Sequence, residues 1–195
     1  MRPRLIVILV LAAMAIIAGV LVTRGAQAGG SSTRQTVPRD GASFAYLATQ
    51  HTNNCGMQAS QLAAYSPGMR LQGSCCSAMD QAAYNAQLAG LRRYTPVRQI
   101  PKNPYDISVA LARQLVGYKA AIHLSVSQQA TYTRAMRMSS EKGPCCCHCW
   151  RWTAFQGMSD YLITRRGWQA RPLAHLIGLV DGCGGKAAEA PHAST

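Results

Sequence analysis

The chain has 195 residues, with 20 Lys or Arg against only 7 Asp or Glu, and a formal net charge of +13. The positive charges are scattered and no nucleic-acid motif accompanies them, so we expect no nucleic-acid partner. The few carboxylates form no close pair, which argues against a carboxylate-dyad hydrolase and against a calcium or magnesium site rich in oxygen ligands.

Residues 1–28 predict export. Arg2 and Arg4 precede an uncharged apolar run over residues 5–22, and residues 26–28 form an A-x-A cleavage pattern. The run is long for a cleaved signal peptide and just long enough to span a bilayer, so an uncleaved N-terminal membrane anchor is the alternative. Both interpretations place the rest of the chain outside the cytoplasm, in the periplasm or at the cell exterior, either secreted or anchored.

Composition divides the remainder of the chain. Residues 29–41 are rich in Gly, Ser and Pro and predict a flexible linker, and residues 186–195 predict a disordered tail. Residues 42–185 are expected to form one small, irregular all-α domain with cysteine-rich loops. No strand pattern is predicted within it.

Capping residues place the expected helices. Asp80 is the expected N-cap of a helix over residues 80–93, and a proline-rich connector follows it. Asp106 is expected to cap the next helix, and Ser125 with Gln128 forms a capping box for a helix that runs toward residue 141. Gly143 is the expected stop of that helix. The last two helices are expected over residues 150–166, ended by Gly167, and over residues 171–180.

Half of the eight cysteines lie in the segment 144–149, Pro-Cys-Cys-Cys-His-Cys. Adjacent Cα atoms lie about 3.8 Å apart, closer than the roughly 4.4–6.8 Å that a disulfide needs, so bonds within this segment are unfavourable. Cys145, Cys147 and Cys149 alternate, and in an extended segment they would share one face. Cys146 and His148 would point the other way, toward a second ion, a hydrogen bond or a disulfide.

Thiolates are soft ligands that select Cu(I), zinc or iron–sulfur clusters. The segment lacks the separated cysteine pairs of structural zinc sites and the spacing of ferredoxins, so Cu(I) is the first expectation and zinc the second. The expected ligands are Cys145, Cys146, Cys147, His148 and Cys149. Additional ligands or disulfide partners are expected among Cys55, Cys75, Cys76, Cys183, His51, Met136 and Met138.

Two alternatives to metal binding remain open at this point. Eight cysteines in an oxidising compartment could instead form a disulfide framework that joins the segment 144–149 to the other four cysteines. In a mixed model, Cys55 or Cys183 pairs with Cys75 or Cys76, and the remaining cysteines bind metal. A thiol-redox protein is the second alternative. A helix N-terminus near Cys149, with Lys142 and Arg151 beside it, favours thiolate, although no C-x-x-C motif is present.

The segment 144–149 resembles the PCYCGC-motif family of exported bacterial cysteine-rich proteins, whose biochemical role is not established. Tyr and Gly of the family motif are replaced here by Cys146 and His148. The matching residues are Pro144, Cys145, Cys147 and Cys149. The resemblance implies an extracytoplasmic location and a metal-binding type of motif. The C-C-x-C at residues 146–149 is also similar to the copper-carrying motif of cytochrome oxidase copper chaperones, without their twin C-x9-C helices.

The sequence therefore predicts an extracytoplasmic protein that carries or sequesters a soft metal, with copper first, and that is not an enzyme. Its expected partner is an exported or membrane-bound protein that handles the same metal. The membrane itself is a partner if the N-terminal segment is not cleaved.

Overall fold

The computed structural model describes residues 43–140, 142–145 and 147–185, which all belong to one compact unit, Val37–Thr195. The predictions for the export segment, the linker and the C-terminal tail lie outside the described residues, as does Cys146. No helix in the described part of the chain has both the length and the apolar character needed to cross a membrane.

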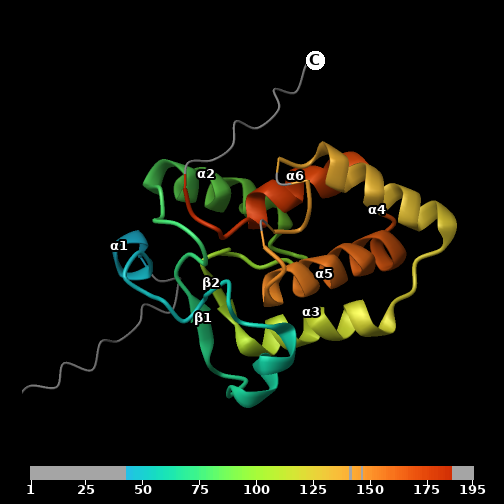
Figure 1. The fold of residues 1–195 in the computed structure, drawn as a ribbon. Helices are drawn as coiled ribbons and strands as arrows, with labels where there is room; N and C mark the ends of the chain where they lie inside the picture. The colour runs from blue at the N-terminus through green and yellow to red at the C-terminus, as the bar shows by residue number, and fades with distance from the viewer. Residues whose placement is uncertain (1–42, 141, 146, 186–195) are drawn as a thin grey trace, which may run out of the picture. The chain divides into compact units, whose positions relative to one another are not determined.

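The described residues are mostly helical, as the sequence predicts (Figure 1). The elements are α1 (Phe44–Leu47), the 3-10 helix η1 (Ala59–Ala64), β1 (Arg70–Gln72), α2 (Gln81–Leu91), the 3-10 helix η2 (Arg92–Tyr94), β2 (Asp106–Ser108), α3 (Val109–Ala121), α4 (Val126–Met138), α5 (Trp150–Arg166) and α6 (Ala170–Val180).

Local capping signals place three of the helix ends correctly. The Asp80 side chain accepts a hydrogen bond from the backbone N–H of Ala83 at the start of α2. The capping box of Ser125 and Gln128 opens α4. Gly167 ends α5 in the left-handed conformation, with φ 66°. Each of these signals acts over three or four residues, so it needs no tertiary context.

The two-stranded sheet is a correction to the all-α prediction. β1 and β2 pair antiparallel, with Gln72 opposite Asp106. Asp106 therefore lies in a strand and does not cap α3; Ser108 does so by accepting a hydrogen bond from the Leu111 N–H. The Asp106 carboxylate instead accepts hydrogen bonds from Arg70 and from the Gln72 amide. Strands of three residues are too short to show alternation in the sequence.

The predicted end of α4 is also wrong. The helix ends at Met138, and Ser139 takes an extended backbone, with φ −73° and ψ 151°. Gly143 is therefore not the residue that ends it. Buried Ser139 donates its hydroxyl hydrogen bond to the Met136 carbonyl, which satisfies one of the last carbonyls of the helix.

Helix α5 organises the hydrophobic core. It packs closely against α3, and its other contacts are with α4, α6 and η1 (Figure 1). A Cβ added at Gly157 would lie 2.0 Å from the Leu115 carbonyl oxygen, so only glycine permits this approach of α3 and α5. Phe155, Met158 and Leu162 are fully buried on α5. The first turn of α5 is thereby held in the interior, next to the cysteine-rich loops.

Candidate metal centre

Seven described cysteines come from four loops and gather in one place. We call them the thiol cluster; all are thiols in this structure. One lies before η1, two follow β1, three precede α5, and one follows α6. The members, in chain order, are Cys55, Cys75, Cys76, Cys145, Cys147, Cys149 and Cys183.

Backbone hydrogen bonds join the loop after β1 to the loop after α6. The Cys75 N–H donates to the Gly182 carbonyl at 3.0 Å, and the N–H groups of Cys76 and Ser77 both donate to the Cys183 carbonyl, at 3.2 and 2.8 Å. Gly184 has φ +83°, and a Cβ there would lie 2.1 Å from the Ser77 carbonyl oxygen. Glycine beside cysteine in this loop therefore serves close backbone approach.

The loop that carries Cys55 is fixed at both of its ends. Buried Asn53 donates its side-chain amide to the Gly73 carbonyl at 2.9 Å and accepts a hydrogen bond from the Trp150 indole at 3.2 Å. The Met57 carbonyl accepts the Trp150 backbone N–H at 2.8 Å. The loop is therefore tied both to the end of β1 and to the start of α5.

The segment 144–149 ends at the N-terminus of α5. Cys149 is the N-cap residue, but its side chain makes no capping hydrogen bond. Its sulfur instead interacts with Cys75 and Cys145. The positive end of the 17-residue helix α5 thus lies beside the thiol cluster, where it stabilises thiolate.

Four members of the thiol cluster are buried, and we call them the inner thiols. Cys183 is central among them, because its sulfur lies 3.4 Å from that of Cys145 and 3.6 Å from that of Cys75. These separations are longer than the S–S bond of about 2.05 Å in a disulfide. The inner thiols are Cys75, Cys145, Cys149 and Cys183, each no more than 7% exposed.

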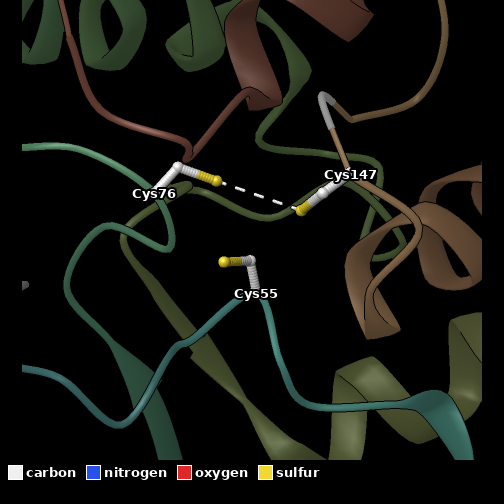
Figure 2. Close-up of side chains that lie close together, drawn as sticks. All are labelled: Cys55, Cys76 and Cys147. Atoms are coloured by element: carbon white, nitrogen blue, oxygen red, sulfur yellow. Dashed lines mark hydrogen bonds between the residues drawn. The ribbon is translucent and has the colours of Figure 1, made fainter.

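The other three members, Cys55, Cys76 and Cys147, form an outer triad. Their sulfur atoms all lie within 4.8 Å of one another around a common space (Figure 2). Cys55 and Cys76 are exposed and Cys147 is partly buried. The outer triad adjoins the inner thiols, since the sulfurs of Cys76 and Cys75 lie 3.4 Å apart.

The thiols of the cluster differ in acidity because they hydrogen-bond to one another. The pKa of Cys145 is lowered from 9.0 to about 6, chiefly by a hydrogen bond from Cys149, with Cys75 and the charge of Arg151 contributing. The pKa of Cys75 is raised, because its hydrogen bonds with Cys145, Cys149 and Cys183, together with its burial, favour the protonated thiol. The lowered pKa favours the thiolate form of Cys145 at neutral pH.

Arg151 brings a buried positive charge to the cluster. It is 0% exposed and donates to the carbonyls of Pro104 and Val180 at 2.9 and 2.8 Å. Its guanidinium carbon lies 4.8 Å from the ring centroid of Phe155, and its Nε has no hydrogen-bond partner among the described residues. The charge acts to lower the pKa of both Cys75 and Cys145. At Cys75 the hydrogen bonds and burial outweigh it, so the pKa of that thiol is still raised. A buried cation of this kind offsets the cost of buried thiolate.

The structure does not bring every residue of the expected ligand set into the cluster. The exposed His148 packs its ring against Trp152, with centroids 4.1 Å apart. His51 is exposed, Met136 is part of the hydrophobic core, and Met138 is 41% exposed. Among the described residues, the groups of donors that could share one ion consist of cysteines alone.

Sequence reasoning left open whether Cys55, Cys75, Cys76 and Cys183 belong with the segment 144–149. Nothing in their spacing shows that four loops converge. The glycines beside Cys55 and on both sides of Cys183 are the available signal, since glycine marks close backbone approach. Asn53, which positions the Cys55 loop, has no sequence signal at all, because its partners Gly73 and Trp150 lie on distant segments.

No protein-family model, curated protein or solved structure matches this chain. Chemical interpretation of the site therefore depends on its own geometry. An all-sulfur donor set with one buried cation is suited to a soft metal ion or to thiol chemistry, and offers no carboxylate ligands for a hard cation.

Proposed function

We propose that this protein is an extracytoplasmic Cu(I)-binding protein that carries or sequesters the ion and does not catalyse a reaction. The observation that carries the proposal is the gathering of seven thiols from four loops. Sulfur–sulfur separations of 3.4 to 3.9 Å link five of them, Cys75, Cys76, Cys145, Cys147 and Cys183. Two sulfurs that bind one ion at about 2.3 Å cannot lie more than about 4.6 Å apart. The separations suit a shared ion without rearrangement of the loops.

Coordination number favours copper over zinc. The donor groups identified among the described residues have three sulfurs each. Structural zinc takes four ligands in a tetrahedron, whereas Cu(I) is stable with two or three soft donors. Zinc remains the second candidate, because the four inner thiols are buried together and interact with one another.

A direct test is the metal content of the full chain, purified from its native compartment without chelator and analysed by elemental mass spectrometry together with thiol counting. We expect bound copper and reduced cysteines. Variant C75S/C147S, which removes at least one sulfur from every group of cysteines that could share an ion, should lose the copper, while M138L, which removes an exposed sulfur outside the cluster, should retain it. Disulfide-bonded cysteines with no metal would refute the proposal and support the stapled-domain alternative; zinc in place of copper would refute the choice of ion.

The expected exchange partner is an exported or membrane-bound protein that handles the same metal. Three features of the outer triad support this part of the proposal: it is sulfur-only, it is accessible, and it adjoins buried thiols. Transfer of Cu(I) between proteins proceeds through shared thiolate ligands, which requires exposed sulfur. The resemblance of the segment 144–149 to the PCYCGC motif agrees with this location and stays a prediction.

A further inference from the structure

The sulfur groups of the thiol cluster overlap. Three groups of sulfurs lie within 4.8 Å of one another among the described residues, and three cysteines each belong to two of them. Cys75, Cys76 and Cys147 are the shared members. The groups are Cys55 with Cys76 and Cys147, Cys75 with Cys145 and Cys147, and Cys75 with Cys76 and Cys183.

A cysteine that belongs to two of these groups could bind two ions at once. A thiolate has more than one lone pair and can bridge two soft ions. Three sulfurs around one ion at about 2.3 Å lie about 4.0 Å apart, and Cys76 and Cys147 are separated by 3.9 Å. The three groups are therefore adjacent ion positions that are linked through common ligands.

Charge also favours more than one ion. If all four inner thiols were ionised around a single Cu(I), three negative charges would remain buried, and Arg151 offsets only one of them. Uncompensated buried charge is costly. Each further Cu(I) that forms a Cu–S bond with an ionised thiol cancels one of these negative charges; the proton was released to water when the thiol ionised, and the copper stays Cu(I).

The positions differ in access to solvent. Cys145, in the second group, is 2% exposed, and Cys183, in the third, is 6% exposed. The outer triad is instead made of two exposed thiols and one partly buried thiol. The outer triad is therefore more accessible than the inner thiols to a ligand that approaches from solvent.

We propose that the thiol cluster binds more than one Cu(I) in sulfur-bridged positions of unequal exchange rate. Cys55, Cys76 and Cys147 hold a rapidly exchanging ion. A retained ion is held by Cys75, Cys145 and Cys183, where the Cys183 sulfur lies 3.6 Å from that of Cys75 and 3.4 Å from that of Cys145. The inference rests on the proposed Cu(I) binding. It adds a pathway in which ions enter and leave through the outer triad by stepwise exchange of shared thiolates.

The experiment uses the full chain in detergent, reduced and kept free of oxygen. Cu(I) is added against a competing Cu(I) chelator, the ions per chain are counted by native mass spectrometry, and release to excess chelator is followed in time. We expect more than one Cu(I) per chain and release in a fast and a slow phase. Variant C55S/C76S should lose the fast phase and keep the slow one, because both substituted side chains are exposed and lie outside the core.

The control M138L should retain both phases, and far-ultraviolet circular dichroism should show that C55S/C76S is folded. Binding of a single Cu(I) would overturn this inference and leave the proposed function intact, whereas no Cu(I) binding would overturn both. Release in one phase, or a C55S/C76S variant with unchanged fast release, would also overturn the inference. The variant C145S/C149S adds a second test, since the slow phase should be lost from it.

Discussion

A buried charge and a hydrogen bond between thiols lower the pKa of Cys145 in the thiol cluster. Arg151 places a cation in the interior, and the Cys149 thiol donates a hydrogen bond that stabilises the Cys145 thiolate. A thiol that is already ionised binds a soft metal without first losing a proton. The lowered pKa of Cys145 would in this way favour binding of the proposed ion at neutral pH.

Cys145 should therefore titrate far below an ordinary cysteine. In the reduced, metal-free protein, we expect thiolate ultraviolet absorbance to rise with a midpoint near pH 6. In C149A the midpoint should rise, because the principal hydrogen-bond donor to Cys145 is removed, while C55S should leave it unchanged. A wild-type protein with no thiolate signal below pH 8 would contradict the assignment.

The same shift predicts how stability depends on pH. Folding lowers the pKa of Cys145 from 9.0 to about 6, so between these values the unfolded chain binds more protons than the folded one. The stabilisation is complete above pH 9 and is lost as pH falls through 6. Urea unfolding of the reduced, metal-free protein should show stability that rises across this window, and the rise should be smaller in C145S.

Substitutions at Arg151 separate its charge from its hydrogen bonds. R151M should raise the pKa of Cys145 and lower the free energy of unfolding by about 1–3 kcal/mol, because buried carbonyls lose a charged donor. R151K keeps the charge, so its thiolate midpoint should stay nearer the wild-type value despite a loss of stability. Equal midpoints in both variants would show that the charge has no influence on the cluster.

At the scale of elements, the decisive feature is the pairing of the loop after β1 with the loop after α6. The backbone N–H of Cys75 donates to the Gly182 carbonyl, and those of Cys76 and Ser77 donate to the Cys183 carbonyl, which fixes the position of Cys183. Neither loop has regular secondary structure of its own, apart from a single bridge between Met79 and Gly185. The position of two inner thiols therefore depends on backbone geometry that glycine makes possible.

Gly184→Ala should disturb this pairing. Its φ of +83° is strained for alanine, and the added Cβ would meet the Ser77 carbonyl oxygen at 2.1 Å. We expect a loss of about 1–3 kcal/mol in urea unfolding and weaker Cu(I) retention. The matched control is Gly178→Ala in α6, where nothing lies within 4 Å of the new Cβ; it should raise stability by about 0.5–1 kcal/mol. An equally stable G184A variant would refute this account of the loop.

At the scale of the whole described fold, the thiol cluster joins segments that are far apart along the chain. Cys55 and Cys183 lie in loops at opposite ends of the described residues, and α5 lies between them in sequence. An ion held by several of these loops would bind the folded state and not the unfolded chain. Metal binding should therefore be coupled to global stability.

Cu(I) loading should raise the free energy of unfolding by about 4 kcal/mol when free Cu(I) is about 1,000 times its dissociation constant. Thermal unfolding with and without the metal, under reducing conditions, measures this gain. A Cu(I) chelator should reverse it. If the free energy of unfolding instead falls on addition of reductant and does not change on addition of the chelator, the loops are joined by disulfides and not by metal.

The sequence by itself determined the helices that begin or end at local signals, such as Asp80, Ser125 and Gly167, because capping acts over a few residues. It also identified the segment 144–149 as rich in soft donors. It did not predict the short sheet. Only the tertiary structure decided that Cys55 and Cys183 lie beside that segment, since their approach depends on core packing around α5 and on hydrogen bonds between distant loops. Contacts of that kind leave no periodic pattern in a sequence.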